Sequence, residues 1–226
     1  MGEPILQRRD DRVRLRGASA KAGYGASEPS QQDDLGRASR LTDLELHGRL
    51  GRMFPERFET ARLLLRPIAP SDAAAIFDGY AQDPEVIRFL TWRPHATIAE
   101  TEAHIARCQR ETDSKTYVLV GKRDGKVIGS FALRRPARHR LGYGYVLARP
   151  FWGMGLMTEV LSHATRWALD RSDIWRIGDV CDCENIGSAR VMERAGLERE
   201  GLLRRWIVHP NVSEEPRDCF AYARSR

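Results

Sequence analysis

Two glycines, Gly153 and Gly155, have the type and spacing in this 226-residue chain that most directly suggest chemistry. They lie in RPFWGMGLMTEV, residues 149–160, between a strand-like run and a helix-like run. The first turn of a helix presents N–H groups without intrahelical partners and a partial positive charge. A glycine places no side chain between those groups and a ligand. The segment is therefore either an ordinary tight turn or a cradle in which backbone amides bind an anion.

Two familiar phosphate-binding glycine motifs do not fit this segment. A dinucleotide fingerprint needs a third glycine, and a P-loop needs Gly-Lys-Ser or Gly-Lys-Thr, and neither follows Gly155. The formal net charge of +6 favours an anionic partner in general, whether nucleic acid, anionic lipid or a phosphorylated cofactor. Because the basic residues are spread along the chain without an aromatic–basic recognition motif, a nucleic-acid partner is not expected.

The elements before the two glycines show alternating strand and helix patterns. Ser71 is a candidate N-cap, Thr97 and Glu100 form a candidate capping box, and Asp124-Gly125 marks a hairpin turn. The pattern predicts strands over 62–68, 115–122, 126–133 and 140–147, and helical segments over 71–82, 83–90 and 97–112.

The helix after the glycines is strongly amphipathic, with a period near 3.6. Its apolar face comprises Leu156, Met157, Val160, Leu161, Ala164, Trp167 and Ala168. Next come a strand (175–183), a helix (185–196) ended by Gly196, two closing strands (199–209 and 217–224) and a polar loop, HPNVSEEP, between them. This order predicts an α/β (α+β) fold with one mixed sheet.

Residues 1–52 differ in composition from the rest of the chain. They are rich in Gly, Ser, Arg, Gln and Asp and carry few large apolar residues, so they predict a disordered or weakly ordered tail. Met53 opens MFPERFETARLLLR like the start of a domain, so a mis-called upstream start is a hypothesis that an intact mass would test. The domain prediction is therefore a tail over 1–52 and one domain over 53–226.

The sequence also bears on the cellular compartment of the protein and on whether it binds a metal ion. There is no apolar stretch of membrane-span length and no export-signal pattern, so a cytoplasmic protein with reduced cysteines is expected. Cys181-x-Cys183 lacks both the two-residue gap and the second pair of a zinc knuckle, so no metal is expected.

Four segments in the same order resemble the GNAT superfamily of N-acetyltransferases, in particular its ribosomal-protein-alanine N-acetyltransferase branch. They are ETARLLLRPIAPSDAAAIF, LGYGYVLARPFWGMGLMTEVL, NIGSARVMERAGLEREGLLR and RDCFAYARSR, and the similarity spans residues 59–226. The resemblance implies a GNAT-type mixed, mostly antiparallel single sheet flanked by helices. It also implies acetyl-CoA as co-substrate, bound in a V-shaped opening between the fourth and fifth predicted strands.

The resemblance also assigns roles to individual residues. Asn185 is expected to contact the cofactor's arm, although an Asn there is also a natural helix N-cap. Ser188 is expected to serve the thioester sulfur, although it could be a plain helix-surface hydroxyl. Trp152 could equally be core packing. The diphosphate is expected on the N–H groups of Trp152, Gly153, Met154, Gly155 and Leu156, and the pantetheine arm beside Val146, Leu147 and Ala148.

Two positions depart from the superfamily pattern. Met192 stands where many members have a Tyr that serves the thiolate, and Gly142 stands where many have an acid. The N–H donor to the oxyanion is expected from the backbone near Leu147 and Ala148. Glu159 is expected to be a first-turn residue that the helix dipole stabilises, and not a catalytic group. The general base stays open between a water relay and Tyr143, Tyr145, Glu198, Glu200 and His95.

The expected reaction is direct transfer of an acetyl group from acetyl-CoA to a primary amine. A protein N-terminus, a polyamine and an aminoglycoside all fit as acceptors, and either a monomer or a homodimer is expected. Trp92, His95 and the loop with Glu214 and Glu215 are expected near the acceptor entrance. The alternative is a non-catalytic acyl-CoA-binding or sensor domain, which the two departures make plausible.

Overall fold

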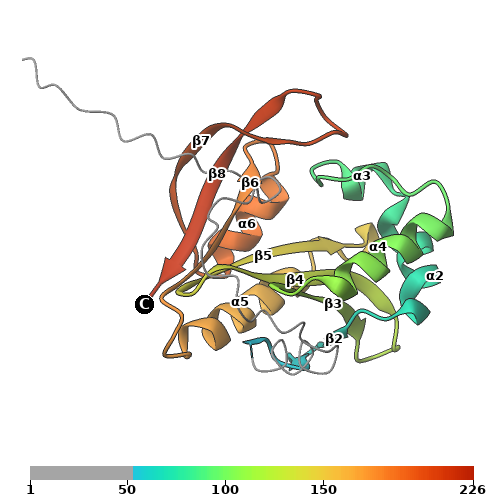
Figure 1. Cartoon of the computed structure of the whole chain (residues 1–226), viewed down its shortest axis with the longest axis horizontal. Helices are drawn as coiled ribbons and strands as arrows, with labels where there is room; N and C mark the ends of the chain where they lie inside the picture. Colours follow the sequence, from blue (N-terminus) through green and yellow to red (C-terminus); the bar gives the residue numbers. More distant parts are fainter. Residues whose placement is uncertain (1–52) are drawn as a thin grey trace, which may run out of the picture. The chain divides into compact units, whose positions relative to one another are not determined.

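An eight-stranded sheet runs through residues 53–226, the part of the chain that the computed structural model describes (Figure 1). The prediction for residues 1–52 lies outside the described residues. The strand order is β1-β2-β3-β4-β5-β6-β8-β7. The strands are β1 (Phe58–Glu59), β2 (Leu63–Pro67), β3 (Ser114–Gly121), β4 (Val127–Ala137), β5 (Arg140–Leu147), β6 (Arg176–Asp182), β7 (Glu198–Val208) and β8 (Pro216–Ser225).

Every neighbouring pair in the sheet is antiparallel except β5 and β6. Those two strands run parallel and pair only at Arg140 with Arg176 and at Leu141 with Ile177. Beyond these two residue pairs, β5 and β6 form no further backbone pairing with each other. The sheet therefore opens between β5 and β6 toward their carboxyl ends, which confirms the mixed, mostly antiparallel GNAT-type fold predicted from the sequence.

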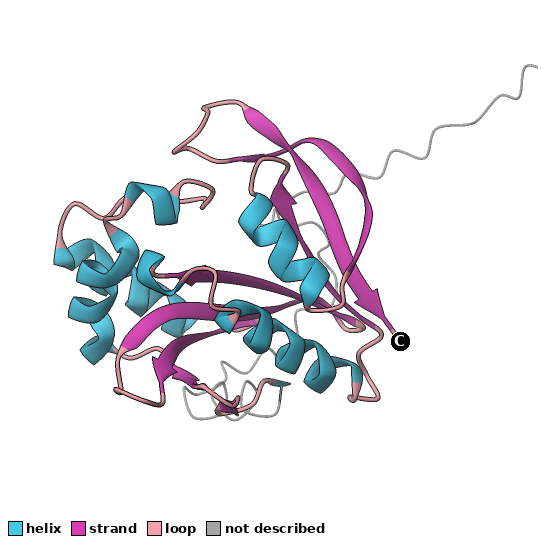
Figure 2. Ribbon diagram, turned by 180° about the vertical axis from the view of Figure 1, so that it is seen from behind, coloured by secondary structure: helices cyan, strands magenta, loops and turns pink. Residues whose placement is uncertain are grey.

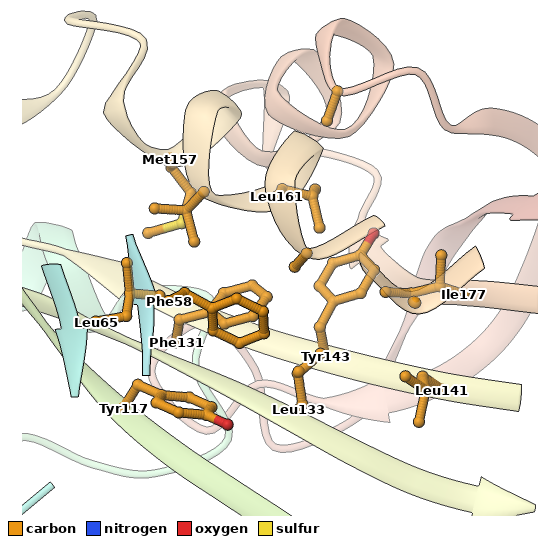
Figure 3. Packing of buried hydrophobic residues seen from close by; sticks show 14 of the residues in the cluster. Phe58, Leu65, Tyr117, Phe131, Leu133, Leu141, Tyr143, Met157, Leu161 and Ile177 are labelled. Carbon is orange, nitrogen blue, oxygen red and sulfur yellow. The ribbon is translucent and has the colours of Figure 1, made fainter. Parts of the chain in front are cut away.

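Helices cover both faces of the sheet (Figure 2). On one face, Met157 and Leu161 of the helix α5 pack against Phe58, Phe131 and Tyr143 from the strands, as Figure 3 shows. A second cluster joins helices of the other face to β3 and β5. The helices are α2 (Ala73–Ile76), α3 (Pro84–Ile87), α4 (Ile98–Arg110), α5 (Leu156–Leu169) and α6 (Ile186–Arg194), with helical turns at Pro70–Asp72, Phe77–Ala81 and Arg149–Phe151.

Local details differ from the sequence prediction in several places. Ser71 is not an N-cap, because the helical turn begins at Pro70 with Ala69 in the N-cap position. The two-residue strand β1 was not predicted, because two residues are too short to show a period. The segment predicted as one helix over 71–82 is a 3₁₀ turn, the helix α2 and a π-helical turn in succession, because apolar spacing does not separate these hydrogen-bond patterns. The Thr97 side chain makes no capping bond, and Glu100 instead accepts from the Ala96 N–H at 3.0 Å.

Helices of membrane-spanning length and apolarity are absent from residues 53–226.

Candidate active site

The opening between β5 and β6 begins where an acidic side chain separates the two strands. Asp179 of β6 accepts hydrogen bonds at Oδ2 from the Tyr143 N–H (2.9 Å) and from Arg134 Nη2 (2.6 Å). A Cβ at Gly142 would lie 3.0 Å from the same oxygen. The glycine that replaces the family's acid therefore leaves room for Asp179, whose carboxylate is already held by these two donors.

A cavity of about 430 Å³ passes through this opening from one face of the sheet to the other. Tyr145 and Cys181 line it from the two strands at the gap. Asn185 and Ser188 line its end beside α6, whereas the α2/α4 face contributes the residues of the other end. Two molecules that enter from opposite faces can therefore meet between β5 and β6.

The turn that leads into α5 has the backbone that its two glycines predict. Gly153 and Gly155 have φ angles of +74° and +72°, which L-residues with side chains rarely adopt. Gly155 is the N-cap of α5, and its carbonyl accepts the first helical bond, from the Glu159 N–H at 3.0 Å. The N–H groups of residues 156–158 consequently have no intrahelical acceptor. We call residues 153–158 the cradle.

Trp152 differs from its predicted roles. Its N–H donates to the Arg149 carbonyl at 3.1 Å, so this amide is not an open donor beside the glycines. The side chain is 47% exposed rather than part of the core, and its Nε1 donates to the Leu147 carbonyl at 2.6 Å. Trp152 therefore connects the cradle to the end of β5.

An arginine from β1–β2 fixes the outer side of the cradle. Arg62 Nη1 donates to the Met154 carbonyl at 2.8 Å, and Arg62 Nε donates to Glu159 Oε2 at 2.6 Å. The Arg62 backbone N–H also donates to Glu159, at 2.9 Å. Glu159 is thus engaged in holding the loop, in agreement with the expectation that it is not catalytic.

The backbone of β5 alternates between its two neighbours, as an antiparallel pairing on one side requires. The Ala148 N–H donates to the Ile128 carbonyl at 2.9 Å, on the β4 side. The backbone groups of Tyr143 and Leu147 instead make their hydrogen bonds on the side of the opening, where the Tyr143 N–H donates to Asp179 and the Leu147 carbonyl accepts from Trp152. The N–H groups of Tyr145 and Leu147 therefore face the opening, so within the stretch near Leu147 and Ala148 where the oxyanion donor was expected, the Leu147 amide faces the opening and the Ala148 amide does not.

A pair of hydroxyl groups lies where the sequence placed a sulfur-binding group. The Ser188 Oγ of α6 and the Tyr145 hydroxyl of β5 are 2.7 Å apart. Burial raises the pKa of Tyr145 and the hydrogen bond to Ser188 opposes it only in part, so the phenol keeps its proton at neutral pH. The Asn185 Oδ1 accepts from the Ser188 N–H at 3.0 Å, which confirms the N-cap role of Asn185 and leaves its amide group to donate.

The far end of the cavity is lined by aromatic and imidazole rings, and we call this end the acceptor side. The Trp92 and His95 rings stack with centroids 4.8 Å apart, and His95 Nδ1 lies 2.8 Å from Thr101 Oγ1. Burial lowers the pKa of His95, and burial together with Arg107 lowers the pKa of His104 to about 4. These imidazoles are therefore neutral at pH 7.

Two further residues of the acceptor side were not singled out by sequence reasoning. His209 and Asp182 are both buried and both line the cavity, although they are 27 positions apart in the sequence (209 minus 182). His209 directly follows the carboxyl end of β7, and Asp182 is the last residue of β6. The sequence signal that could have identified both residues was their position where a strand ends and a loop begins, because binding and catalytic residues are frequent in such connecting segments.

The acidic candidates predicted for this region do not line the cavity, and three of the four are paired with arginines. Glu198 and Glu200 are exposed on β7 and do not line the cavity, and Glu200 pairs with Arg176. Glu214 pairs with Arg93 at 2.7 Å, and Glu215 pairs with Arg205 at 2.5 Å. The structure therefore gives none of these four carboxylates a place in the cavity.

The loop between β7 and β8 is tied across the acceptor side. Asn211 Nδ2 donates to the carbonyls of Ile87 (2.9 Å) and Trp92 (2.7 Å), which lie at least 119 positions away in the sequence. Figure 1 shows this loop and α3 facing each other above the sheet. We call residues 209–215 the strap, since they join the β7–β8 hairpin to the segment after α3.

Metal ligation has no evident site in the described part of the chain. No group of three or more His, Cys, Asp or Glu side chains there is placed to hold an ion. Cys181 and Cys183 are free thiols.

Comparisons with known proteins agree with this architecture. Residues 62–198 match the family model for the acetyltransferase (GNAT) domain. The chain is 32% identical over 177 residues to the uncharacterized N-acetyltransferase YoaA of Bacillus subtilis, covering 76% of this chain and 97% of that one. It is 25% identical over 170 residues to the ribosomal protein uS5-alanine N-acetyltransferase of Escherichia coli, covering 67% and 83%.

A solved structure shows the same fold at lower identity. RimL, a ribosomal L7/L12 alpha-N-protein acetyltransferase solved with coenzyme A, has a TM-score of 0.66 and 22% identity, covering 75% of this chain and 98% of that one. Fold and relatives together define an acyltransferase that uses acetyl-CoA. The chain belongs to the GNAT family of N-acetyltransferases.

Proposed function

We propose that this N-acetyltransferase binds acetyl-CoA through the cradle and acetylates the N-terminal amine of a protein. The observation that carries the proposal is the turn at Gly153 and Gly155, whose positive φ angles open a row of amide donors next to a gap in the sheet. Backbone amides at a helix N-terminus bind a diphosphate without requiring side-chain charge. Trp152, Met154 and Ile186 leave apolar surface exposed near this end, which suits a ligand with an apolar arm.

The pantetheine arm is assigned to the edge of β5 that faces the opening. Pairing with the free amide of Leu147 would continue the sheet by one hydrogen bond, and the Tyr145 amide remains for the acetyl oxygen. Val146 and Ala148 use their amides toward β4, so any contact from them comes through their side chains. The amide of Asn185 is placed to donate to the arm from α6.

The leaving thiolate is assigned to the Ser188–Tyr145 pair. Ser188 donates a proton or a hydrogen bond toward the sulfur, and the Tyr145 hydroxyl donates to Ser188 in turn. Met192, which cannot donate, is buried at the neighbouring turn of α6. The two hydroxyls therefore supply the function that the superfamily usually gives to a tyrosine of that helix.

The charges of the cavity favour a single amine over a polycation. Asp179 is paired with Arg134, and Asp182 is paired with Arg217, so of the three carboxylates that line the cavity only Glu111, which directly follows α4, is left for a cationic acceptor. The histidines of the acceptor side are neutral at pH 7. The relative that acetylates an alanine of ribosomal protein uS5 supports the same choice.

A panel of amines with acetyl-CoA, followed by release of free CoA thiol, tests the proposal. The panel comprises an alanine-initiated hexapeptide, the same peptide already N-acetylated, spermidine and kanamycin. We expect the free peptide to be turned over with a kcat/KM at least about tenfold above the two polycations, and the blocked peptide not at all. Thiol release with spermidine or kanamycin alone would move the assignment to a small-molecule acceptor. Tight CoA binding without turnover of any amine would support the acyl-CoA sensor instead.

A further inference from the structure

His209 has both ring nitrogens buried without a hydrogen-bond partner, although its ring lines the cavity. The residue is only 5% exposed and directly follows β7. A buried polar group usually has a partner in the protein, a water or a ligand, and an exception calls for an explanation. Neither nitrogen makes a hydrogen bond of standard geometry, although Nε2 faces Asp182 Oδ2 and the Leu90 backbone lies beside the ring, so a molecule in the cavity would reach the imidazole next to these two groups.

The surroundings of His209 keep it neutral and oriented. Asp182 Oδ2 of β6 lies 3.8 Å from His209 Nε2, and Arg217 of β8 holds Asp182 with bonds of 2.6 and 3.2 Å. The Phe89 ring packs edge-to-face on the imidazole at 6.2 Å. Burial lowers the pKa of His209, with Arg217 acting in the same direction and with Asp182 and the Leu90 backbone opposing. The ring is therefore a free base at neutral pH.

The other tyrosines and histidines that line the cavity are less suitable proton acceptors, and two of its three carboxylates, Asp179 and Asp182, are paired with arginines. Tyr143 and Tyr145 have pKa values raised by burial, so they are acids that keep their protons. His104 uses both nitrogens, with Arg107 at 2.8 Å and with Cys108 Sγ at 3.5 Å. His95 has one nitrogen engaged by Thr101. His209 is the imidazole of the acceptor side whose nitrogens make no hydrogen bond of standard geometry.

We propose that His209 is the general base of the acetyl transfer, with Asp182 as a positioning residue, and this rests on the proposed function. The acceptor enters as an ammonium ion and gives one proton to a ring nitrogen of His209. Its nitrogen lone pair then attacks the thioester carbonyl carbon, the C–S bond breaks, and the new amide nitrogen loses its second proton. One proton leaves with the CoA thiol, and the one held by His209 passes to solvent.

The experiment compares His209→Gln with the rival variant His95→Gln and with the control His139→Gln, whose side chain is exposed and does not line the cavity, on two peptides. One peptide begins with alanine, and the other begins with trifluoroalanine, whose electron-withdrawing group makes the amine weakly basic and neutral at pH 7. We expect His209→Gln to lower kcat by about a hundredfold on the alanine peptide, the lower end for a lost general base, and by less than about tenfold on the fluorinated one. His139→Gln should change kcat on both peptides by less than about threefold, and His95→Gln should lower kcat to the same extent on both peptides. In His209→Ala, added imidazole should restore part of the rate.

Several outcomes would overturn the assignment. An equal loss on both peptides would indicate a structural role, and a selective loss in His95→Gln would move the base to that residue. CoA affinity of each variant, measured separately, shows whether the site is folded. Wild-type turnover of the alanine peptide tests the proposed function, whereas the variant-to-wild-type ratio tests His209. If no amine is accepted, the same ratio measured on acetyl-CoA hydrolysis by water decides the role of His209, and an unchanged ratio rejects it.

Discussion

The two ends of the opening between β5 and β6 are built in different ways. The cradle end is made of backbone groups from one continuous stretch, from Tyr143 to Thr158, with α6 beside it; residues 143–146 of this stretch line the cavity, and the cradle lies beyond them along the chain. The acceptor side is made of side chains from three separate segments, around His95, Asp182 and His209. A backbone site depends on conformation and tolerates many side chains, whereas a side-chain site depends on each residue type. Substitutions should therefore act on co-substrate affinity at one end and on turnover or acceptor affinity at the other.

The largest effect is expected from Gly153→Asp at the cradle end. A carboxylate at about 5 Å from a phosphate charge costs on the order of 3 kcal/mol at an effective dielectric constant of 20, or about a hundredfold in Kd. We expect calorimetric titration with CoA to show a loss of at least that size.

Two control variants separate charge from backbone strain. Gly153→Asn has nearly the same shape without the charge and should lose much less affinity than Gly153→Asp. Gly125→Asp places the same side chain at another glycine with positive φ (+68°) and open space, in the β3–β4 turn, and should leave CoA binding unchanged. Equal losses in all three variants would remove the electrostatic account of the cradle.

A smaller effect is expected where the two ends meet, at the Ser188–Tyr145 pair. Ser188→Ala and Tyr145→Phe each remove one hydroxyl, and we expect either to lower kcat about tenfold, or about 1.4 kcal/mol, with little change in CoA affinity. The double variant should be hardly slower than either single one, because the two groups act in series. Tyr117→Phe is the matched control, since its hydroxyl bonds only to the Pro55 carbonyl at 2.7 Å. A normal rate in Ser188→Ala would exclude the pair from the mechanism.

The smallest effect is expected from the strap on the acceptor side. Asn211→Ala removes two hydrogen bonds, each worth about 1 kcal/mol, that tie residues 209–215 to the segment after α3. We expect the KM for the peptide to rise about fivefold while the Kd for CoA stays constant. Arg93→Ala breaks only the exposed pair with Glu214 and should change neither value. A change in CoA affinity in Asn211→Ala would contradict the separation of the two ends.

The difference between the two ends also explains how much the sequence could predict. The strand over 140–147, the glycine turn and the helix from Leu156 follow from local spacing, and the structure has them at those residues. The N-cap at Asn185 is equally local. Hydrogen-bond partners were not accessible in this way. Which β5 amides face β4 depends on strand register, and the bond from the Trp152 N–H to the Arg149 carbonyl depends on the geometry of a local 3₁₀ turn.

The acceptor side depends on long-range contacts throughout. No spacing rule connects His209 to Asp182, because their proximity results from the order β6-β8-β7 in the sheet. None connects Asn211 to Ile87 either, because Ile87 lies on α3, 124 positions away in the sequence. Other contacts of the folded chain pair Glu200, Glu214 and Glu215 with arginines, so these three carboxylates are not free, although the sequence alone made them candidates. Composition identifies candidate groups, but partners determine which of them are free.

The binding of a diphosphate by bare amides at the cradle is tested most directly by amide NMR of the ¹⁵N-labelled protein. CoA and pantetheine, which lacks the diphosphate, would be titrated in parallel. The account predicts that the N–H signals of Gly153, Met154 and Gly155 shift strongly with CoA and hardly at all with pantetheine. If CoA binds while these three signals stay in place, or if pantetheine shifts them equally, the diphosphate is held elsewhere.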